Sequence, residues 1–233
     1  MSKLYVVATP IGNLEDITLR AARVLKEADL ILCEDTRVTK KLLDKFEIKN
    51  KLDSYHSQSK ISKTDKILSL LSEGKDLALV SDAGTPTISD PGSQLIKIIR
   101  EHMPEVEIVS VPGASALTAA MSISGITGGD FTFLGFLPHK KGRETLFKEM
   151  AESDRTFVFY ESTHRLLKTI DSLIKFCPNK KVFIAKELTK MHEEMIIGSA
   201  EELKEYFKQY PDKVKGEFVV MVAEGREIIL GLN

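Results

Sequence analysis

The chain has few of the residues that bind metals or form disulfides. Its 233 residues include only two cysteines, Cys33 and Cys177, and five histidines, none of them in a His-x-x-x-His pair. These numbers exclude a cysteine-rich zinc site, and no metal site is expected. The low cysteine content is typical of a protein that works without disulfides in the reducing cytosol, so we expect a cytoplasmic location.

Long apolar runs and an excess of one charge are also lacking. The longest apolar runs are only as long as a strand, and the N-terminus lacks the basic-then-apolar pattern of a secretory signal, so no membrane partner is expected. Lys and Arg number 33 against 34 Asp and Glu, which gives a net charge of −1. This balance argues against a generic polyanion binder, and no DNA partner is expected.

Contact with nucleic acid would have to come from local basic clusters. Each cluster taken alone is more simply explained as a solvated helix start or helix face. The clusters comprise His139, Lys140, Lys141 and Arg143 in one segment, and Arg37, Lys40 and Lys41 in another.

The usual nucleotide-binding motifs are missing too. No loop has the Gly-Lys-Ser/Thr ending of a P-loop, and no segment matches G-x-G-x-x-G, so the usual arguments for a nucleoside triphosphate or NAD do not apply. Any ligand site must use backbone groups, small side chains and carboxylates. Such a set suits a flat, charged cofactor that carries a ribose.

What the sequence does contain is a set of apolar strands that end in loops rich in Pro and Gly. Residues 77–80 run into Ser81–Gly92, residues 4–8 into Thr9–Leu14, and residues 106–109 into Ser110–Ala116. Open α/β sheets bind ligands outside the carboxyl ends of their strands, so three such loops predict one continuous binding edge. A single loop of this kind is also ordinary turn chemistry, and the prediction depends on the three together.

The alternation of strand and helix patterns predicts an α/β protein with two α/β domains. Strands near 4–8, 29–33, 51–55, 76–81 and 106–109 should form a mostly parallel first sheet. A Gly-rich segment at 122–130 suggests a boundary between domains of residues 1–124 and 125–233. In the second part the strands lie closer together in sequence, which favours a mixed sheet.

Two helix starts and one ion pair can also be predicted. Asp16 is expected to cap the first helix, and Ser199 with Glu202 forms a capping-box sequence. Glu161 and Arg165 are four residues apart, which predicts an ion pair at a helix start worth a few tenths of a kcal/mol.

An ordered set of motifs carries a resemblance that covers nearly the whole chain. It resembles the ribosomal RNA small subunit methyltransferase I family, a branch of the tetrapyrrole methylase superfamily. The motifs are Thr9–Asp16, Cys33–Arg37, Tyr55–His56, Ser81–Pro86 with Ser89–Gly92, Pro112–Ala116, Tyr160–Arg165, Ala185–Lys190 and Lys215–Glu217. Tetrapyrrole enzymes carry a Gly-Pro-Gly type first loop and a Gly-Asp-Pro second loop, which this chain replaces. Thr163 stands where the RNA branch usually has proline.

The resemblance implies two domains of the tetrapyrrole methylase type that enclose S-adenosylmethionine, and a homodimer. It also implies 2'-O-methylation of a cytidine in 16S ribosomal RNA, in the decoding region of the small ribosomal subunit. Two other activities remain open at this point: a methyltransferase of the same fold acting on a tetrapyrrole or a protein side chain, and a ribosome-assembly factor without catalysis.

Candidate site residues follow from the loops together with the resemblance. A base for the ribose hydroxyl is sought in Lys186 and Glu187, ranked slightly ahead of Glu34 and Asp35. The expected cofactor-binding residues are Pro10, Ile11, Gly12, Asp82, Ala83, Gly84, Thr85, Ser115, Ala116, Tyr160 and Ala185. The expected RNA-binding residues are Arg37, His56, Lys140, Lys141 and Arg143. A histidine such as His56 is more often a structural hydrogen-bonding group than a catalyst.

Overall fold

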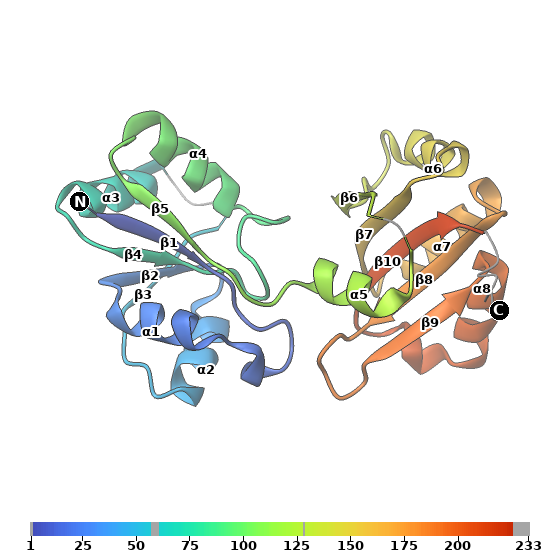
Figure 1. The fold of residues 1–233 in the computed structure, drawn as a ribbon, viewed down its shortest axis with the longest axis horizontal. Helices are drawn as coiled ribbons and strands as arrows, with labels where there is room; N and C mark the ends of the chain where they lie inside the picture. Colours follow the sequence, from blue (N-terminus) through green and yellow to red (C-terminus); the bar gives the residue numbers. More distant parts are fainter. Residues whose placement is uncertain (1, 57–60, 128, 226–233) are drawn as a thin grey trace, which may run out of the picture. The chain divides into compact units, whose positions relative to one another are not determined.

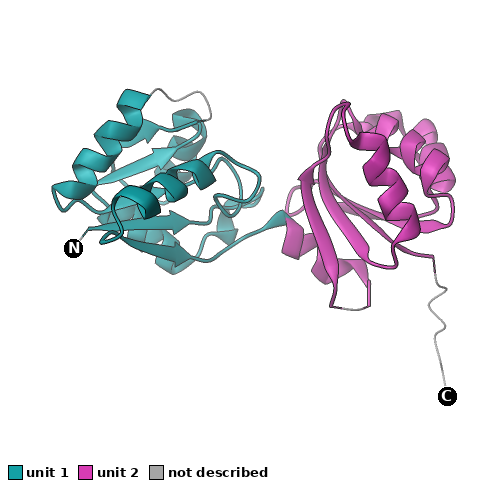
Figure 2. Ribbon diagram, turned by 90° about the horizontal axis from the view of Figure 1, so that it is seen from above, with its two compact units in different colours: residues 1–116 teal, residues 117–233 magenta. Residues whose placement is uncertain are grey.

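The chain forms two α/β units joined by a single connection. The computed structural model describes residues 2–56, 61–127 and 129–225 (Figure 1). The units are Met1–Ala116 and Leu117–Asn233, shown in different colours in Figure 2. Helix α5 (Ala116–Ser124) therefore falls almost entirely in unit 2, whereas the sequence-based division after Ser124 would assign it to the first domain.

Unit 1 is built on a parallel sheet. Its strand order is β3-β2-β4-β1-β5, and every neighbouring pair is parallel. This confirms the mostly parallel first sheet expected from the sequence. The strands are β1 (Lys3–Val7), β2 (Leu30–Cys33), β3 (Leu52–Ser54), β4 (Leu77–Leu79) and β5 (Glu107–Val111).

Helices cover both faces of the unit 1 sheet, as Figure 1 shows. On one face, α1 (Leu19–Glu27) and α2 (Thr36–Lys45) bury a cluster that includes Leu25, Leu43 and Ile31. On the other, α3 (Ile61–Ser72) and α4 (Gly92–His102) bury a second cluster that includes Leu71, Ile99 and Leu4. Burial on both faces explains why these strands read as continuous apolar runs.

The start of α1 differs from the prediction. Asp16 does not cap this helix, because it belongs to the short 3-10 helix η1 (Leu14–Asp16). The cap is Thr18, whose hydroxyl oxygen accepts a hydrogen bond from the Ala21 N–H at 3.0 Å. Asp16 and Thr18 both lie within three residues of the start of α1, but Asp16 is already part of η1, so Thr18 is left to cap the helix.

Unit 2 contains a mixed sheet, as expected, in the order β6-β7-β10-β8-β9. Only the β6 and β7 pair is parallel in this sheet, within the described residues. Its strands are β6 (Phe131–Phe136), β7 (Thr156–Ser162), β8 (Lys180–Lys186), β9 (Glu194–Gly198) and β10 (Glu217–Glu224). Its helices besides α5 are α6 (Arg143–Glu152), α7 (Leu166–Phe176), α8 (Ala200–Gln209) and the 3-10 helix η2 (Pro211–Val214).

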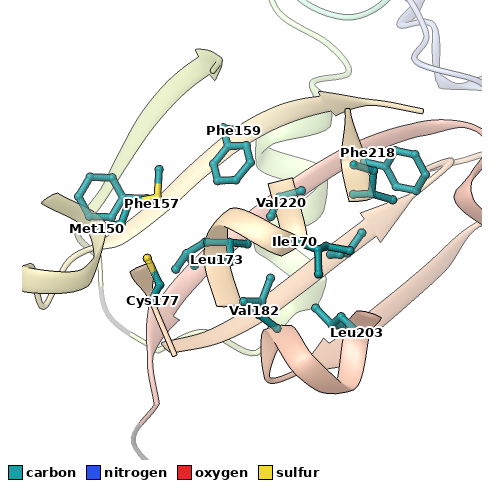
Figure 3. Packing of buried hydrophobic residues seen from close by; sticks show 14 of the residues in the cluster. Met150, Phe157, Phe159, Ile170, Leu173, Cys177, Val182, Leu203, Phe218 and Val220 are labelled. Carbon is teal, nitrogen blue, oxygen red and sulfur yellow. The ribbon is translucent and has the colours of Figure 1, made fainter. Parts of the chain in front are cut away.

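The core of unit 2 lies between one face of this sheet and helices α6, α7 and α8. Figure 3 shows Phe159, Val220 and Val182 from three strands facing Leu173 of α7 and Leu203 of α8. The predicted capping box at the start of α8 is confirmed. Ser199 accepts from the Glu202 N–H at 3.2 Å, and the Glu202 carboxylate accepts from the Ser199 N–H at 2.7 Å.

Candidate active site

The carboxyl ends of the parallel strands in unit 1 bring four loops to one edge of the sheet. The loops follow β1, β2, β4 and β5 and contain most of the residues predicted for the cofactor. The β1 and β4 loops pair through Thr9 and Gly84, whose backbone groups exchange hydrogen bonds at 2.9 and 3.0 Å. The edge is therefore a hydrogen-bonded structure rather than a set of separate turns.

Side chains extend this connection to the neighbouring loops. The buried Thr9 hydroxyl donates to the Ser81 carbonyl oxygen at 3.1 Å. The Thr85 hydroxyl donates to the Ala114 carbonyl oxygen at 3.2 Å, which ties the β4 loop to the β5 loop that carries Ser115. Thr9 belongs to the motif Thr9–Asp16, but the sequence did not predict it as a site residue, because its role depends on contacts with residues more than 70 positions away.

Gly84 serves the packing of the edge. Its φ is +81°, in the left-handed region, and a Cβ there would lie 3.2 Å from the Ile11 Cγ2 atom. A larger residue would be strained and would press on Ile11. Pro10 and Ile11 are themselves buried, whereas Gly12, Asp82 and Ala83 are exposed. The surface that a ligand can reach at this edge therefore comes from Gly12, Asp82 and Ala83 and from the neighbouring carboxylate groups.

Asp82 and the β2 loop are joined in both directions. The Asp82 carboxylate accepts from the Asp35 N–H at 3.0 Å, and the Asp82 N–H donates to the Glu34 carboxylate at 3.4 Å. Desolvation raises the pKa of Glu34, with the Asp82 N–H opposing the shift. Desolvation also raises the pKa of Asp82, with the Asp35 N–H opposing it. Two carboxyl groups with raised pKa thus lie side by side at this edge.

Asp35 has a structural role in the same loop. Its carboxylate caps α2 by accepting from the Arg37 N–H at 2.8 Å, and it also pairs with the Arg37 guanidinium. Hydrogen bonds from the Arg37 side chain, followed by the Arg37 N–H, lower the pKa of Asp35 to about 2. These contacts make Asp35 a poor proton acceptor and hold Arg37 at the start of α2.

The later part of the β4 loop contains two strained residues. Thr87 and Ser89 have φ of +74° and +70°, a conformation that costs a non-glycine residue free energy and is commonly found at functional sites. The Asp90 carboxylate stabilises this shape, because it accepts from the N–H groups of both Thr87 and Gly92. Burial raises the pKa of Asp90.

His56 lies at the same edge, just beyond β3. It is exposed, and it follows Tyr55, whose N–H donates to the Cys33 carbonyl oxygen at 2.7 Å. Because β3 is the outer neighbour of β2, His56 belongs to the side of the edge that carries Glu34.

In unit 2 the predicted residues divide between the two faces of the sheet. Tyr160 and Ala185 both pair with Val219 of β10 and so stand in one line across three strands. Lys186 stands in the next line, opposite Phe218. Since successive residues of a strand point to opposite faces, Lys186 lies on the face of Val182 and Ile184, which pack under the helices. Tyr160 and Ala185 lie on the other face.

Glu187 is held by its own neighbours. Its backbone has φ +48°, and its carboxylate accepts from the Glu217 N–H at 2.8 Å and from Lys190 at 2.9 Å. Burial alone would raise its pKa, but these hydrogen bonds outweigh burial, so the pKa lies below its ordinary value. A carboxylate with these contacts is suited to fixing the β8 and β10 ends rather than to accepting a proton.

The basic residues predicted to bind RNA do not all lie on the surface. Lys140 and Lys141 are exposed, but Arg143 is only 7% exposed and its guanidinium contacts Thr169 and Pro138 inside unit 2. The Glu161 and Arg165 pair also differs from the prediction. The ion pair is present at 3.4 Å with Arg165 at the start of α7, but Glu161 is in strand β7 and 2% exposed, so the pair belongs to a buried network. The four-residue spacing of Glu161 and Arg165 does not by itself predict that Glu161 is buried.

The residues of the unit 1 edge fit a ribose-bearing methyl donor. The exposed Asp82 carboxylate supplies an acceptor for hydroxyl groups, and exposed small residues leave backbone groups accessible. In the described residues, no group of three or more His, Cys, Asp or Glu side chains could hold a metal ion. No helix in that part of the chain is long and apolar enough to cross a membrane.

Comparison with known proteins agrees with this fold. Residues 3–204 match the family model described as Tetrapyrrole (Corrin/Porphyrin) Methylases. Among solved structures, the methyltransferase CobJ superposes with a TM-score of 0.72 at 21% identity, covering 98% of this chain and 97% of that one. A uroporphyrin-III C-methyltransferase from Thermus thermophilus, solved with S-adenosylhomocysteine, gives 0.66 at 19% identity, covering 96% and 98%. The chain is thus a methylase of the tetrapyrrole methylase class.

Proteins with similar sequences show which branch of the tetrapyrrole methylases this chain belongs to. Ribosomal RNA small subunit methyltransferase I of Thermotoga maritima is 46% identical over 97% of this chain and 100% of its own length. The Bacillus subtilis protein of the same name is 42% identical over 95% of this chain and 75% of its length. The chain belongs to the ribosomal RNA small subunit methyltransferase I family, which confirms the resemblance seen in the motifs. The expected cofactor class, S-adenosylmethionine, is confirmed for the family.

Proposed function

We propose that this protein transfers a methyl group from S-adenosylmethionine to the 2'-hydroxyl of a cytidine in 16S ribosomal RNA, in the decoding region of the small subunit. The observation that carries the proposal is the 46% identity to a ribosomal RNA small subunit methyltransferase I over 97% of the chain. The net charge of −1 further favours a folded ribonucleoprotein particle as substrate over free RNA bound by charge alone.

The donor would lie against the unit 1 edge. Asp82 and the backbone of Gly12 and Ala83 would bind its polar groups. The family resemblance also implies roles in cofactor binding for Tyr160 and Ala185, which lie on one face of the second sheet. When bound, S-adenosylmethionine supplies an electrophilic sulfonium methyl group, so the protein's main task is to align donor and acceptor in line, which contributes about 7–11 kcal/mol.

The acceptor needs a base, because a ribose hydroxyl is a weak nucleophile. The O–H proton passes to the base as the oxygen forms its bond to the methyl carbon and the carbon–sulfur bond breaks. A positioned base contributes about 10²–10⁴-fold. The hydrogen bonds and ion pairs of Glu187 and Asp35 favour structural roles over proton transfer. Lys186 lies on the face of the sheet that the helices cover, which argues against it as the base. We therefore place Glu34 first, since it is half-buried, has a raised pKa and accepts one long hydrogen bond at 3.4 Å.

Methyl transfer to purified small subunits tests the activity directly. Labelled S-adenosylmethionine is incubated with the protein and either small subunits or naked 16S RNA, and the RNA is digested to nucleosides. Label in 2'-O-methylcytidine supports the proposal. Label in another nucleoside contradicts the proposed methylation of the cytidine 2'-hydroxyl. Label in protein or in an added tetrapyrrole favours a same-fold enzyme with another substrate, and binding without transfer favours an assembly factor.

We also propose that the protein acts as a homodimer in the cytoplasm, as the family resemblance implies. Two copies would present two sets of basic residues to one ribosomal particle. Sedimentation at micromolar concentration measures the mass of the species in solution, and a mass of one chain would contradict the dimer.

A further inference from the structure

The segment between β6 and α6 carries exposed positive charge on a fixed backbone. We call Pro138–Gly142 the basic loop; His139, Lys140 and Lys141 in it are exposed. In the part of the chain that the structure describes, no ion pair joins these three residues to a carboxylate. The loop closes through the Arg143 N–H, which donates to the Lys140 carbonyl oxygen at 3.2 Å, and through Gly142 at φ +81°.

Two arginines hold the start of the basic loop from inside unit 2. Arg143 donates from Nη1 to the Pro138 carbonyl oxygen at 3.3 Å and from Nη2 to the Thr169 hydroxyl at 2.8 Å. Arg165 donates from Nη2 to the carbonyl oxygens of Leu137 and Pro138. Both guanidinium groups therefore bind main-chain oxygens of the loop or of the residue before it.

One buried carboxylate supports both arginines. Glu161, whose side chain is fully buried, accepts from the Thr169 hydroxyl at 2.6 Å and lies 3.4 Å from Nε of Arg165. The network thus holds two guanidinium groups against one carboxylate and carries an excess positive charge.

We propose that the basic loop contacts the phosphate backbone of the RNA substrate, and that Arg143 and Arg165 are positioning residues that fix the loop. This inference rests on the proposed function. Arg143 is too buried to meet a phosphate itself, since it is 7% exposed and packs 5.1 Å from the centre of the Phe147 ring. A loop that is already fixed loses less conformational entropy on binding, so its anchors raise affinity without touching RNA.

The salt dependence of binding separates the two roles. Removing one phosphate contact should flatten the plot of log affinity against log salt by about 0.7–0.9, whereas a weaker hold on the loop lowers affinity at every salt concentration and leaves the slope unchanged. Binding of the full chain to purified small subunits is measured from low to moderate salt. Binding of S-adenosylhomocysteine is measured in parallel by calorimetry.

The variants are chosen to keep or remove charge. Lys140→Ala with Lys141→Ala should flatten the slope by about 1.4–1.8. Arg143→Lys and Arg143→Gln should both weaken binding several-fold with the wild-type slope, because neither can reach both partners of the guanidinium. Thr169→Val removes one of those partners with the charge intact and should act in the same way if the Arg143 variants do not fold. Lys204→Ala with Lys208→Ala on α8, which removes two exposed cations paired with Asp171 and Glu205, is the control for the loss of two surface charges elsewhere.

Each result decides the proposal. A flatter slope for Arg143→Gln, with Arg143→Lys like wild type, would make Arg143 a direct phosphate contact and overturn its positioning role. Binding by the Lys140 and Lys141 double variant equal to that of the α8 control would remove the basic loop from the RNA surface. If the wild-type protein binds S-adenosylhomocysteine but neither binds nor methylates small subunits, the proposed function fails and the inference fails with it.

Discussion

The carboxylate of Asp82 accepts a hydrogen bond from the backbone N–H of Asp35 at 3.0 Å, across 47 residues of sequence. This contact joins the ends of β4 and β2, neighbours in the parallel sheet. It also gives Asp82 a structural task besides the proposed binding of the cofactor, and the two tasks can be separated by substitution.

Asp82→Ala should weaken binding of S-adenosylhomocysteine by about tenfold or more, equivalent to about 1.4 kcal/mol. Asp82→Asn keeps an oxygen acceptor for the Asp35 N–H and removes the charge, so it reports on the ionic part alone. Calorimetry measures both, with Asp65→Ala on the exposed side of α3 as a control. Wild-type affinity in both Asp82 variants would show that this residue does not bind the cofactor.

Glu34→Gln should lower single-turnover methyl transfer by at least about 10²-fold with cofactor affinity nearly intact. The amide oxygen can still accept from the Asp82 N–H, so the loop should keep its shape. Because the ionised carboxylate is the active form and its pKa is raised, the wild-type rate should fall as pH falls through that pKa.

Lys186→Met and Glu187→Gln test the two unit 2 candidates for the proton acceptor, and their rates are compared with that of Glu34→Gln. We expect single-turnover rates within a few-fold of wild type for Lys186→Met, and a loss of stability for Glu187→Gln because Lys190 would lose one of its two carboxylate partners. A large rate loss in Lys186→Met, with Glu34→Gln active, would place the base in unit 2. If all these variants stay active, alignment alone carries the reaction.

Asp35→Asn should reduce the pH dependence of stability in acid. The pKa of Asp35 is lowered from 3.8 to about 2 in the folded protein, so the ionised carboxylate contributes stability that is present above pH 3.8 and is lost as pH falls towards 2. Asparagine keeps the helix cap but not the charge. Urea unfolding at several pH values between 6 and about 3 measures the difference between wild type and variant, which should shrink with falling pH. A constant difference would contradict the assigned pKa.

Thr163→Val should lower the free energy of unfolding by about 1–3 kcal/mol. The Thr163 hydroxyl donates to the Gly216 carbonyl oxygen and accepts from the Gly216 N–H, both at 2.9 Å, and so joins the end of β7 to the start of β10. The proline that the RNA branch usually has at this position could make neither bond. Thr163→Ser keeps the hydroxyl and is the control in urea unfolding. Equal stability of the valine and serine variants would show that this pair contributes nothing measurable.

Several features could be read from the sequence because their causes are local. The strand-to-loop patterns, such as the one at residues 77–92, predicted loops that meet at one edge of the unit 1 sheet, and the Ser199 and Glu202 pair predicted the start of α8. Parallel strands bring their carboxyl ends to one edge whatever the details of packing, so the edge followed from the prediction of a parallel sheet. The ordered motifs also identified the family, because together they extend over most of the chain.

Only the tertiary structure decided which of the candidate side chains are free to act. Arg143 is part of an exposed-looking basic run, yet its partner Thr169 is 26 residues away and brings it into the interior. Lys186 is the last residue of β8 and Glu187 follows it, but strand alternation turns Lys186 towards the helices, and a hydrogen bond from the N–H of Glu217, 30 residues on, engages Glu187. A side chain's local pattern determines its element, whereas its hydrogen-bond partners and burial depend on chain segments that meet only when the sheets are assembled.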